Sequence, residues 1–291
     1  MNYYCYANMP VRGQAGTILK RTDIQVSIND LVMLRGYGAF DYMRTYYGVP
    51  FRIKDYLDRF ESSAKGMKLK LPVNRKKMSS IVSSLLHKNE IHKREKSAKN
   101  VGIRFLLTGG YSLDSYLPGI KPNLFILIED LPQYPQWWSE KGIKLMVHEH
   151  NREMASVKTV NYITAINLAD ERRKRKAQDT LYSSHGQILE TTRNNFFVFK
   201  GNTLITSDSG ILFGITRKVV LELAKKKFKV EKRALYTHEL KSCTECFITG
   251  TTRGITPVVQ VDNLKIGRGR VGENTKELMQ MFYDLVKREC E

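Results

Sequence analysis

The chain has 291 residues, of which 42% are hydrophobic and 26% are charged, which is ordinary for a globular protein long enough for two domains. No run of about 18 apolar residues occurs, so the sequence predicts no transmembrane helix and no membrane partner. The first residues, 1–5, lack the basic and apolar regions of a signal peptide, and we therefore expect a cytoplasmic protein.

The formal net charge of +19 is unusual and raises the hypothesis of a nucleic-acid partner. The excess lies in helix-like stretches at residues 92–96, 171–176 and 225–227, which contain no aromatic side chains that would stack on bases. We interpret these stretches as solvated surface and expect no nucleic acid to bind. A basic nucleic-acid-binding protein stays the alternative from another functional class.

Four cysteines are too few and too scattered for a disulfide scaffold. Cys243 and Cys246 have the spacing of a redox or zinc pair, but no second pair completes a zinc site. We expect two partly buried thiols and no metal.

The first half of the chain contains an alternation of strand-like and helix-like segments. At residues 75–89, apolar side chains recur at helical spacing. The predicted elements are a turn and strand within 34–45, a short strand at 51–53, helices at 54–65 and 75–89, and strands at 101–107 and 123–128.

A stretch rich in proline and tryptophan, residues 131–138, then interrupts the periodicity. Beyond it we expect a strand at 142–149, a helix at 162–176, a strand–turn–strand region at 179–199, a helix at 217–227, a strand at 246–248 and a helix at 275–289. The sequence therefore predicts an α+β protein with a small N-terminal domain (1–130), a linker (131–141) and a larger C-terminal domain (142–291).

Lys158 and Glu190, both in the second half of the chain, are the two residue types that one cofactor requires of a protein. Lys158 lies in a non-periodic stretch just before a predicted helix, and Glu190 follows it by 32 residues at the end of a strand-like run. Pyridoxal 5′-phosphate requires a lysine amine that forms a Schiff base and an anion that keeps its pyridine nitrogen protonated. The pair predicts this cofactor, provided that a phosphate site accompanies it.

Two segments have the composition of such a phosphate site. Residues 213–217 open a predicted helix with Gly214 and Thr216, and backbone N–H groups at a helix N-terminus bind anions. Residues 249–254 form a second turn rich in glycine and threonine. Arg59 is the candidate arginine that completes the clamp.

Together these segments resemble the class IV, or fold-type IV, pyridoxal-phosphate aminotransferases: branched-chain aminotransferases, D-amino acid transaminases and aminodeoxychorismate lyases. The resemblance extends from about Asp30 to Gly272. The motifs that carry it lie at residues 55–60, 158–162, 190–196, 214–217 and 250–257.

The resemblance implies a two-domain fold like that of D-amino acid aminotransferase, with the active site between the domains and the cofactor lysine in the larger one. It implies that Lys158 binds the cofactor covalently, that Glu190 contacts the pyridine nitrogen and that Tyr162 lies near O3′. The other implied cofactor-binding residues are Arg59, Asn195, Ile215, Thr216, Thr251 and Thr252. It also implies a homodimer in which residues 34–40 reach the neighbour's active site.

Two departures from the family pattern concern substrate binding. Arg193 stands where a small residue is usual, and Arg35 stands where branched-chain enzymes carry tyrosine. A desolvated arginine needs an anion, and a substrate carboxylate would supply it. Arg104 occupies a position that binds carboxylate in parts of the family. The resemblance also implies substrate contacts from Phe40, Thr252 and Arg253.

We therefore expect an aminotransferase that passes an amino group from an amino acid to the cofactor and on to a 2-oxo acid. The additional arginines favour substrate binding of the D-amino-acid-transaminase type. A branched-chain aminotransferase and an aminodeoxychorismate lyase are the alternatives within the fold.

Overall fold

The computed structural model describes residues 3–9, 14–91, 98–119 and 121–291. The chain divides into two compact units. Unit 1 comprises Met1–Pro132, Val157–Asn161 and Val286–Glu291, and unit 2 comprises Gln133–Ser156 and Tyr162–Leu285. The sequence placed Lys158 in the C-terminal domain, whereas its segment groups with unit 1, because the backbone of that segment hydrogen-bonds to a unit 1 strand.

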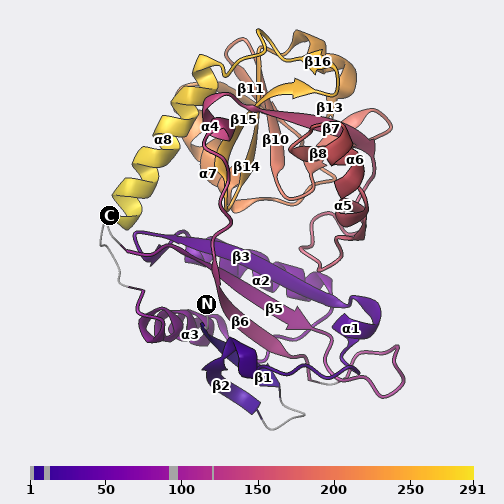
Figure 1. The fold of residues 1–291 in the computed structure, drawn as a ribbon, viewed down its shortest axis with the longest axis vertical. Helices are drawn as coiled ribbons and strands as arrows, with labels where there is room; N and C mark the ends of the chain where they lie inside the picture. Colours follow the sequence, from indigo (N-terminus) through magenta and orange to yellow (C-terminus); the bar gives the residue numbers. More distant parts are fainter. Residues whose placement is uncertain (1–2, 10–13, 92–97, 120) are drawn as a thin grey trace. The chain divides into compact units, whose positions relative to one another are not determined.

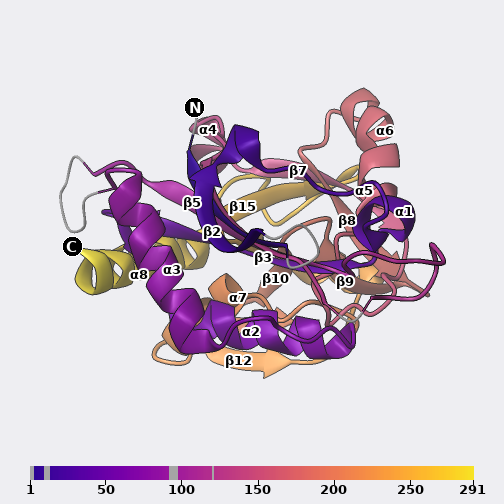
Figure 2. The ribbon, with the colours of Figure 1, turned by 90° about the horizontal axis from the view of Figure 1, so that it is seen from below.

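Unit 1 is built on a six-stranded sheet in which every neighbouring pair is antiparallel. The strand order is β2 (Gln14–Lys20), β1 (Tyr4–Met9), β6 (Leu124–Asp130), β5 (Val101–Thr108), β3 (Gly38–Tyr46) and β4 (Val49–Pro50). The unit also contains α1 (Leu31–Arg35), α2 (Ile53–Gly66), α3 (Arg75–Lys88) and the 3₁₀ helix η2 (Arg21–Asp23). Helix α2 packs on β3, α3 packs on β1 and β6, and both helices lie on one face of the sheet (Figures 1 and 2).

Helix α2 of unit 1 forms because its apolar residues share one face. Helix α2 buries Tyr56, Leu57, Phe60 and Ala64, which are spaced by one or two turns. The ring of Phe60 lies 5.4 Å from that of Phe105 on β5, centroid to centroid. These contacts attach α2, which carries Arg59, to the centre of the sheet.

Unit 2 is built on a ten-stranded sheet. Its strands are β7 (Ile143–Glu149), β8 (Asp179–Ser184), β9 (Gln187–Thr191), β10 (Asn195–Lys200), β11 (Thr203–Thr206), β12 (Lys229–Lys232), β13 (Leu235–Tyr236), β14 (Glu245–Gly250), β15 (Gly254–Val261) and β16 (Leu264–Lys265). Its helices are α4 (Trp137–Glu140), α5 (Ile163–Asn167), α6 (Ala169–Lys174), α7 (Ile215–Ala224), the 3₁₀ helix η3 (Thr237–Ser242) and α8 (Glu273–Cys290), whose last residues belong to unit 1. The order β10-β14-β15-β7-β8-β9, with a further pairing of β10 to β9, closes a ring of six strands.

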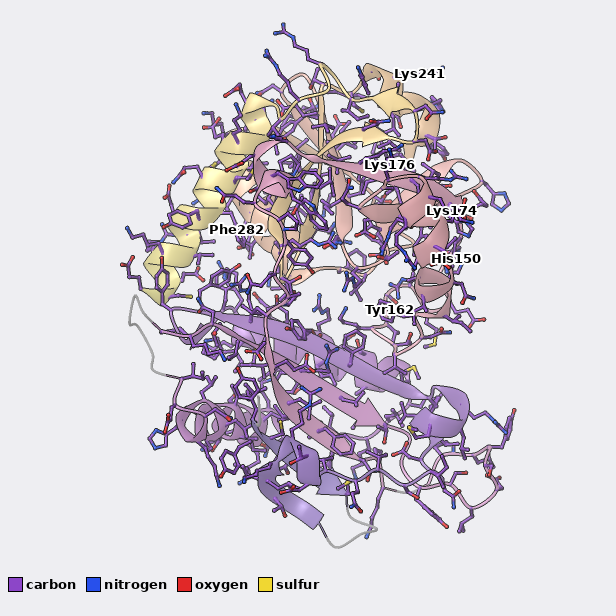
Figure 3. All side chains as sticks on the ribbon, in the orientation of Figure 1. His150, Tyr162, Lys174, Lys176, Lys241 and Phe282 are labelled. Atoms are coloured by element: carbon purple, nitrogen blue, oxygen red, sulfur yellow. The ribbon has the colours of Figure 1, made fainter. Side chains whose placement is uncertain are left out.

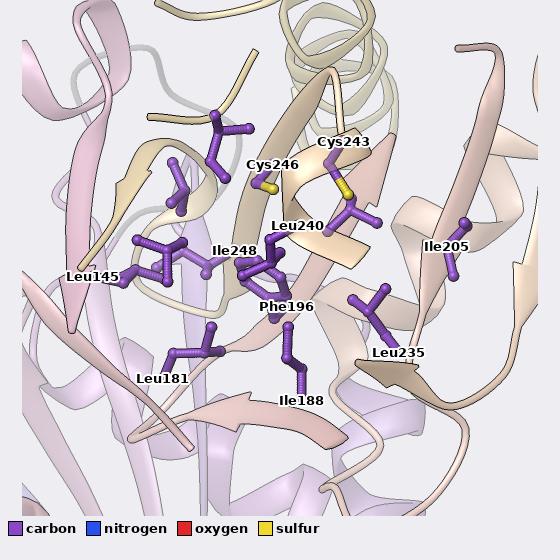
Figure 4. Packing of buried hydrophobic residues seen from close by; sticks show 14 of the residues in the cluster. Leu145, Leu181, Ile188, Phe196, Ile205, Leu235, Leu240, Cys243, Cys246 and Ile248 are labelled. Atoms are coloured by element: carbon purple, nitrogen blue, oxygen red, sulfur yellow. The ribbon is translucent and has the colours of Figure 1, made fainter. Parts of the chain in front are cut away.

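The core of unit 2 fills the inside of this sheet. Phe196, Leu181, Ile188 and Ile248 are among its buried members (Figure 4). Cys243 and Cys246 belong to the same cluster, and all four cysteines are free and buried. The two thiols expected to be partly buried are thus almost fully covered, at 3% and 2% exposure.

Several predicted elements have different bounds in the structure. The helix expected at 162–176 is two short helices, α5 and α6, that meet at Leu168. The region 179–199 holds three strands, because His185 and Gly186 both adopt positive φ, as a tight β8–β9 hairpin requires. The strand expected at 51–53 is absent among the described residues there, since Arg52 has a φ of 53° and Ile53 begins α2.

One expectation about the surface can be compared with the described part of the chain, and one lies outside it. Across the residues that the structure describes, no helix is both long and apolar enough to cross a membrane. The basic stretch at 92–96 lies outside the described residues.

Candidate active site

Lys158 is held in unit 1 through its own peptide groups. Its backbone N–H donates to Oγ of Ser63 at 3.2 Å, and its carbonyl accepts from the backbone N–H of Phe40 at 2.9 Å. Its Nζ lies 4.5 Å from the centroid of the Phe40 ring. The lysine expected to react is therefore fixed at the backbone, with its amine over an aromatic face.

Arg59, the predicted phosphate ligand of unit 1, is oriented by a carboxylate. Its Nε and Nη2 donate to the two carboxylate oxygens of Asp41 at 2.8 and 2.6 Å. Asp41 is fully buried on β3, and the Arg59 guanidinium lies over the Tyr56 ring. Because a bidentate pair has a defined plane, Asp41 determines the direction in which the remaining edge of Arg59 points.

Glu190 is buried in unit 2 at the end of β9 and accepts several hydrogen bonds. Nε and Nη2 of Arg152 donate to its Oε1 at 3.0 and 2.7 Å, and the backbone N–H of Leu212 lies 3.2 Å from both carboxylate oxygens. Sequence reasoning missed Arg152. Two features of the sequence could have suggested Arg152, although neither is specific to it. A buried carboxylate needs a counter-ion, and Arg152 lies in the non-periodic stretch between β7 and Lys158.

Asn195 connects Glu190 to the loop before α7. It lies opposite Glu190 in the β10–β9 pairing, and its Nδ2 donates to Oε2 of Glu190 at 3.2 Å and to the carbonyl of Leu212 at 2.7 Å. Its Oδ1 accepts from the backbone N–H of Gly214 at 3.2 Å. The predicted cofactor-binding asparagine thus ties the carboxylate to the start of the predicted phosphate site.

The N-terminus of α7 has the features of an anion site. The first N–H groups of a helix have no acceptor within it, and no side chain of the described residues caps this end, whose N-cap is Gly214. Ile215 and Thr216 are buried in its first turn. A Cβ on Gly214 would lie 2.2 Å from Oδ1 of Asn195, so only glycine allows this close approach.

Arg217 in the same turn adds a buried positive charge. Its Nη2 donates to the carbonyl of Ser207 at 2.8 Å, whereas its buried Nε has no hydrogen-bond partner among the described residues. Burial lowers the pKa of the Arg217 guanidinium. An anion near this turn would offset the cost of burying that charge.

The second predicted turn connects β14 to β15. A Cβ on Gly250 would lie 2.1 Å from Oδ1 of Asn194, which explains why glycine precedes Thr251. The hydroxyl of Thr252 lies 3.2 Å from that of Tyr134. Burial acts to raise the pKa of Tyr134, but the bond to Thr252 and nearby positive charge lower it overall.

Arg253 and Arg104, both expected to contact substrate, are already engaged with protein carboxylates. Nη1 of Arg253 lies 3.2 Å from the buried carboxylate of Asp179, and its guanidinium packs against the rings of Tyr134 and Trp138 at 4.6 and 4.8 Å. Nε and Nη2 of Arg104 donate to Glu129 at 3.0 and 2.9 Å.

Arg35 and Arg193, unlike Arg253 and Arg104, are exposed. Arg35 is exposed at the end of α1 and donates to the carbonyl of Leu34 at 2.9 Å. Arg193 is exposed in the turn between β9 and β10. Neither forms an ion pair with any residue in the described ranges. Both charges are exposed, whereas the sequence argument for a substrate carboxylate assumed desolvated arginines.

An aromatic and histidine pair lies near Glu190 in unit 2. Tyr182 on β8 packs edge-on against His150 with the centroids 4.8 Å apart, and His150 and Tyr162 are marked in Figure 3. Burial raises the pKa of Tyr182 to about 12 and, with nearby positive charge, lowers that of His150. Tyr162, at the N-cap of α5, is half-buried.

Known proteins match this chain over most of its length. The family model described as amino-transferase class IV matches residues 38–261. A putative branched-chain-amino-acid aminotransferase of Methanocaldococcus jannaschii is 32% identical over 283 residues, which cover 93% of this chain and 94% of that protein. A D-alanine aminotransferase of Listeria monocytogenes is 25% identical over 94% of this chain and 95% of its own length.

A solved structure supports the fold. The Escherichia coli branched-chain amino acid aminotransferase has a TM-score of 0.88 and 25% identity, covering 100% of this chain and 97% of that one. The α+β, fold-type IV architecture expected from the sequence is confirmed by this likeness.

Proposed function

Because this chain belongs to the class IV aminotransferase family, we propose that it is a transaminase that moves an amino group between a D-amino acid and a 2-oxo acid. Aminotransferase activity and the pyridoxal 5′-phosphate cofactor come with the family. The handedness of the substrate, the roles of individual residues and the homodimer are our proposal.

The residues of unit 2 fit a phosphorylated cofactor. The N-terminus of α7 carries no side-chain cap, Gly214 leaves room beside it, and the buried Nε of Arg217 has no partner within the described residues. A phosphate would accept from these N–H groups. Within unit 2, Ile215, Thr216, Thr251 and Thr252 would hold it. Arg59 stays the further phosphate ligand that the family resemblance implies.

Lys158 and Glu190 have the reactive roles in this proposal. When bound, the cofactor supplies an electron sink for charge that develops at the substrate Cα. Glu190, which accepts hydrogen bonds from Arg152 and Asn195, would keep the pyridine nitrogen protonated. The Nζ of Lys158 would take up and return the proton that leaves the substrate Cα. Tyr162 would contact the O3′ side.

The D-amino-acid assignment is supported chiefly by Arg35 and Arg193, whose charges no carboxylate of the described residues compensates. A substrate carboxylate is their natural counter-ion, since charge-assisted, bidentate bonds to arginine are strong. Phe40, next to Lys158, would supply an apolar contact for the substrate. Arg104 and Arg253 have carboxylate partners and would shape the pocket rather than bind the substrate carboxylate.

A branched-chain aminotransferase is the second candidate, because the Methanocaldococcus jannaschii relative that carries this name is 32% identical over nearly its full length. In that case the arginines would be neutral to catalysis and an apolar pocket would select the substrate.

Apolar exposure on unit 1 supports a homodimer. Met33 of α1 is 59% exposed, and Leu113, Tyr116 and Leu117 are 93%, 73% and 60% exposed on the loop between β5 and β6. Such side chains gathered on two adjoining segments are typical of an interface with another chain. In a homodimer, Arg35 would act in the neighbouring subunit. The cytoplasmic location stays a prediction.

Two experiments test the proposal. Borohydride reduction of the cofactor-loaded protein, followed by peptide mass spectrometry, should place the pyridoxyl mass on Lys158. Adding single L- and D-amino acids to the loaded protein should bleach the visible absorption with D-amino acids first. Bleaching by L-leucine or L-valine alone would favour the branched-chain candidate, and a label on another lysine would contradict the site.

A further inference from the structure

The segment Val157–Asn161 is attached to unit 1 although both its flanks belong to unit 2. Thr159 forms an antiparallel bridge with Ala39 at the start of β3. The backbone N–H of Val160 donates to the carbonyl of Gly38 at 3.1 Å, and that of Phe40 donates to the carbonyl of Lys158 at 2.9 Å. The lysine segment therefore runs as a short extra strand along β3.

Helix α2 holds the same segment from a second side. Ser63 is 1% exposed, and its Oγ accepts the backbone N–H of Lys158 at 3.2 Å. One turn later on the same face, Gly66 faces Val157: a Cβ at Gly66 would lie 2.6 Å from Cγ2 of that valine. The hydroxyl of Ser63 and the missing side chain of Gly66 together let the segment lie against the helix.

We propose that Ser63 is a positioning residue for Lys158, and that Gly66 supplies the close approach on which this contact depends. The inference rests on the proposed role of Lys158. With its N–H bound by α2 and its carbonyl bound by β3, the two peptide planes that flank the Lys158 Cα are both fixed. Only the side-chain torsions of Lys158 can then move its Nζ. The amine therefore occupies the same position in every catalytic cycle. Rates depend steeply on such placement.

The test compares Ser63→Ala with Ser62→Ala, a matched loss of an exposed hydroxyl on the same helix. In the cofactor-free protein, amide hydrogen exchange of the peptide spanning 157–161 should speed up by about fivefold in Ser63→Ala, as the loss of one hydrogen bond implies. It should stay at the wild-type rate in Ser62→Ala.

In the loaded protein, Ser63→Ala should lower kcat by about 10-fold to 100-fold and leave KM within about a factor of two. The pH at which the visible absorption changes should shift, because that transition reports the environment of the Lys158 nitrogen. Ser63→Cys, whose side chain has the same shape but is slightly larger and a weaker acceptor, should give an intermediate kcat. A purely structural serine would lower the melting temperature without moving kcat or the spectrum.

Gly66→Ala provides an independent variant should Ser63→Ala fail to fold. Its methyl group should displace Val157 and speed exchange of the same peptide with Ser63 intact. If wild-type Lys158 takes the pyridoxyl label but both variants match Ser62→Ala in exchange, kcat and spectrum, the positioning role is overturned and the proposed function stands. If wild-type Lys158 takes no label, the proposed function itself fails.

Discussion

Arg152 and Glu190 form an ion pair inside unit 2, with Nη2 of Arg152 2.7 Å from Oε1 of Glu190 and the two side chains 17% and 7% exposed. The same Nη2 donates to the carbonyl of Ala155 at 2.6 Å. Arg152 therefore both neutralises the buried carboxylate and tethers it to the chain that leads into Val157. The orientation of the Glu190 carboxylate is therefore already fixed before a pyridinium nitrogen would bind to it.

Replacing Arg152 with methionine should destabilise the fold and slow transamination. It leaves a buried carboxylate without its partner, which costs about 3–5 kcal/mol in free energy of unfolding when the pair is buried. Urea denaturation and kcat measure the two effects, and Arg152→Lys should recover most of the stability but less of the rate. The control is Arg175→Met, which breaks exposed pairs with Glu171 and Asp262 and should change stability by about 1 kcal/mol or less.

Glu190→Gln should slow transamination while the protein still folds. The amide keeps the shape but removes the charge that protonates the pyridine nitrogen, and the expected loss in kcat is on the order of 10²- to 10⁴-fold. Stopped-flow half-reactions measure it. A near-wild-type rate would show that Glu190 holds only the fold, especially if the variant melts at a lower temperature.

Arg193→Lys should raise KM for amino and oxo acids and leave the cofactor spectrum unchanged. Lysine keeps the charge but loses the planar fork, and a charged hydrogen bond is worth about 1.5–3 kcal/mol. Steady-state kinetics with D- and L-substrates measure the change. Arg173→Lys on α6 serves as the control, and an equal KM in both variants would remove the basis for the D-amino-acid assignment.

Gly214→Ala should weaken cofactor binding. The added methyl group would lie 2.2 Å from Oδ1 of Asn195 and would push that side chain and the first turn of α7 apart. Fluorescence titration of the cofactor-free protein with pyridoxal 5′-phosphate should show an affinity loss of about 10-fold or more, equal to about 1.4 kcal/mol. The exposed Ser209→Ala in the same loop should bind as wild type. Unchanged affinity in Gly214→Ala would argue against a phosphate at this turn.

Glu239 should make stability depend on pH in a defined window. The hydrogen bond from Arg233, helped by that from Lys200, lowers the pKa of Glu239 from 4.5 to about 2. Because the folded carboxylate binds a proton less readily than the unfolded one, its contribution is full above pH 4.5 and is lost as the pH falls towards 2. Glu239→Gln should therefore melt below wild type at neutral pH. The difference in melting temperature between the two proteins should vanish as the pH approaches 2. A difference that stays constant from pH 4.5 down to 2 would contradict this role of Glu239.

The sequence predicted most accurately those features that depend on residues close together in the chain. Apolar spacing predicted α3 close to its observed bounds, and the fold type and family followed from short motifs whose order along the chain is independent of how it folds. The family in turn implied the cofactor. Elements with weak periodicity were less accurate, as the break at Leu168 shows, because tertiary packing overrides a marginal helical preference there.

The partners of the site residues depended on tertiary structure. Arg152 meets Glu190 across 38 residues of sequence, and Ser63 meets Lys158 across 95. No local pattern encodes such pairs, since a counter-ion or a hydroxyl acceptor can come from any segment that the fold brings near. The sequence by itself determined which residue types the chemistry needs and the family to which they belong. Long-range packing decided which arginines are paired with Asp41, Glu129 and Asp179, because burial demands a partner for every charge that it covers, whereas Arg35 and Arg193 lie exposed.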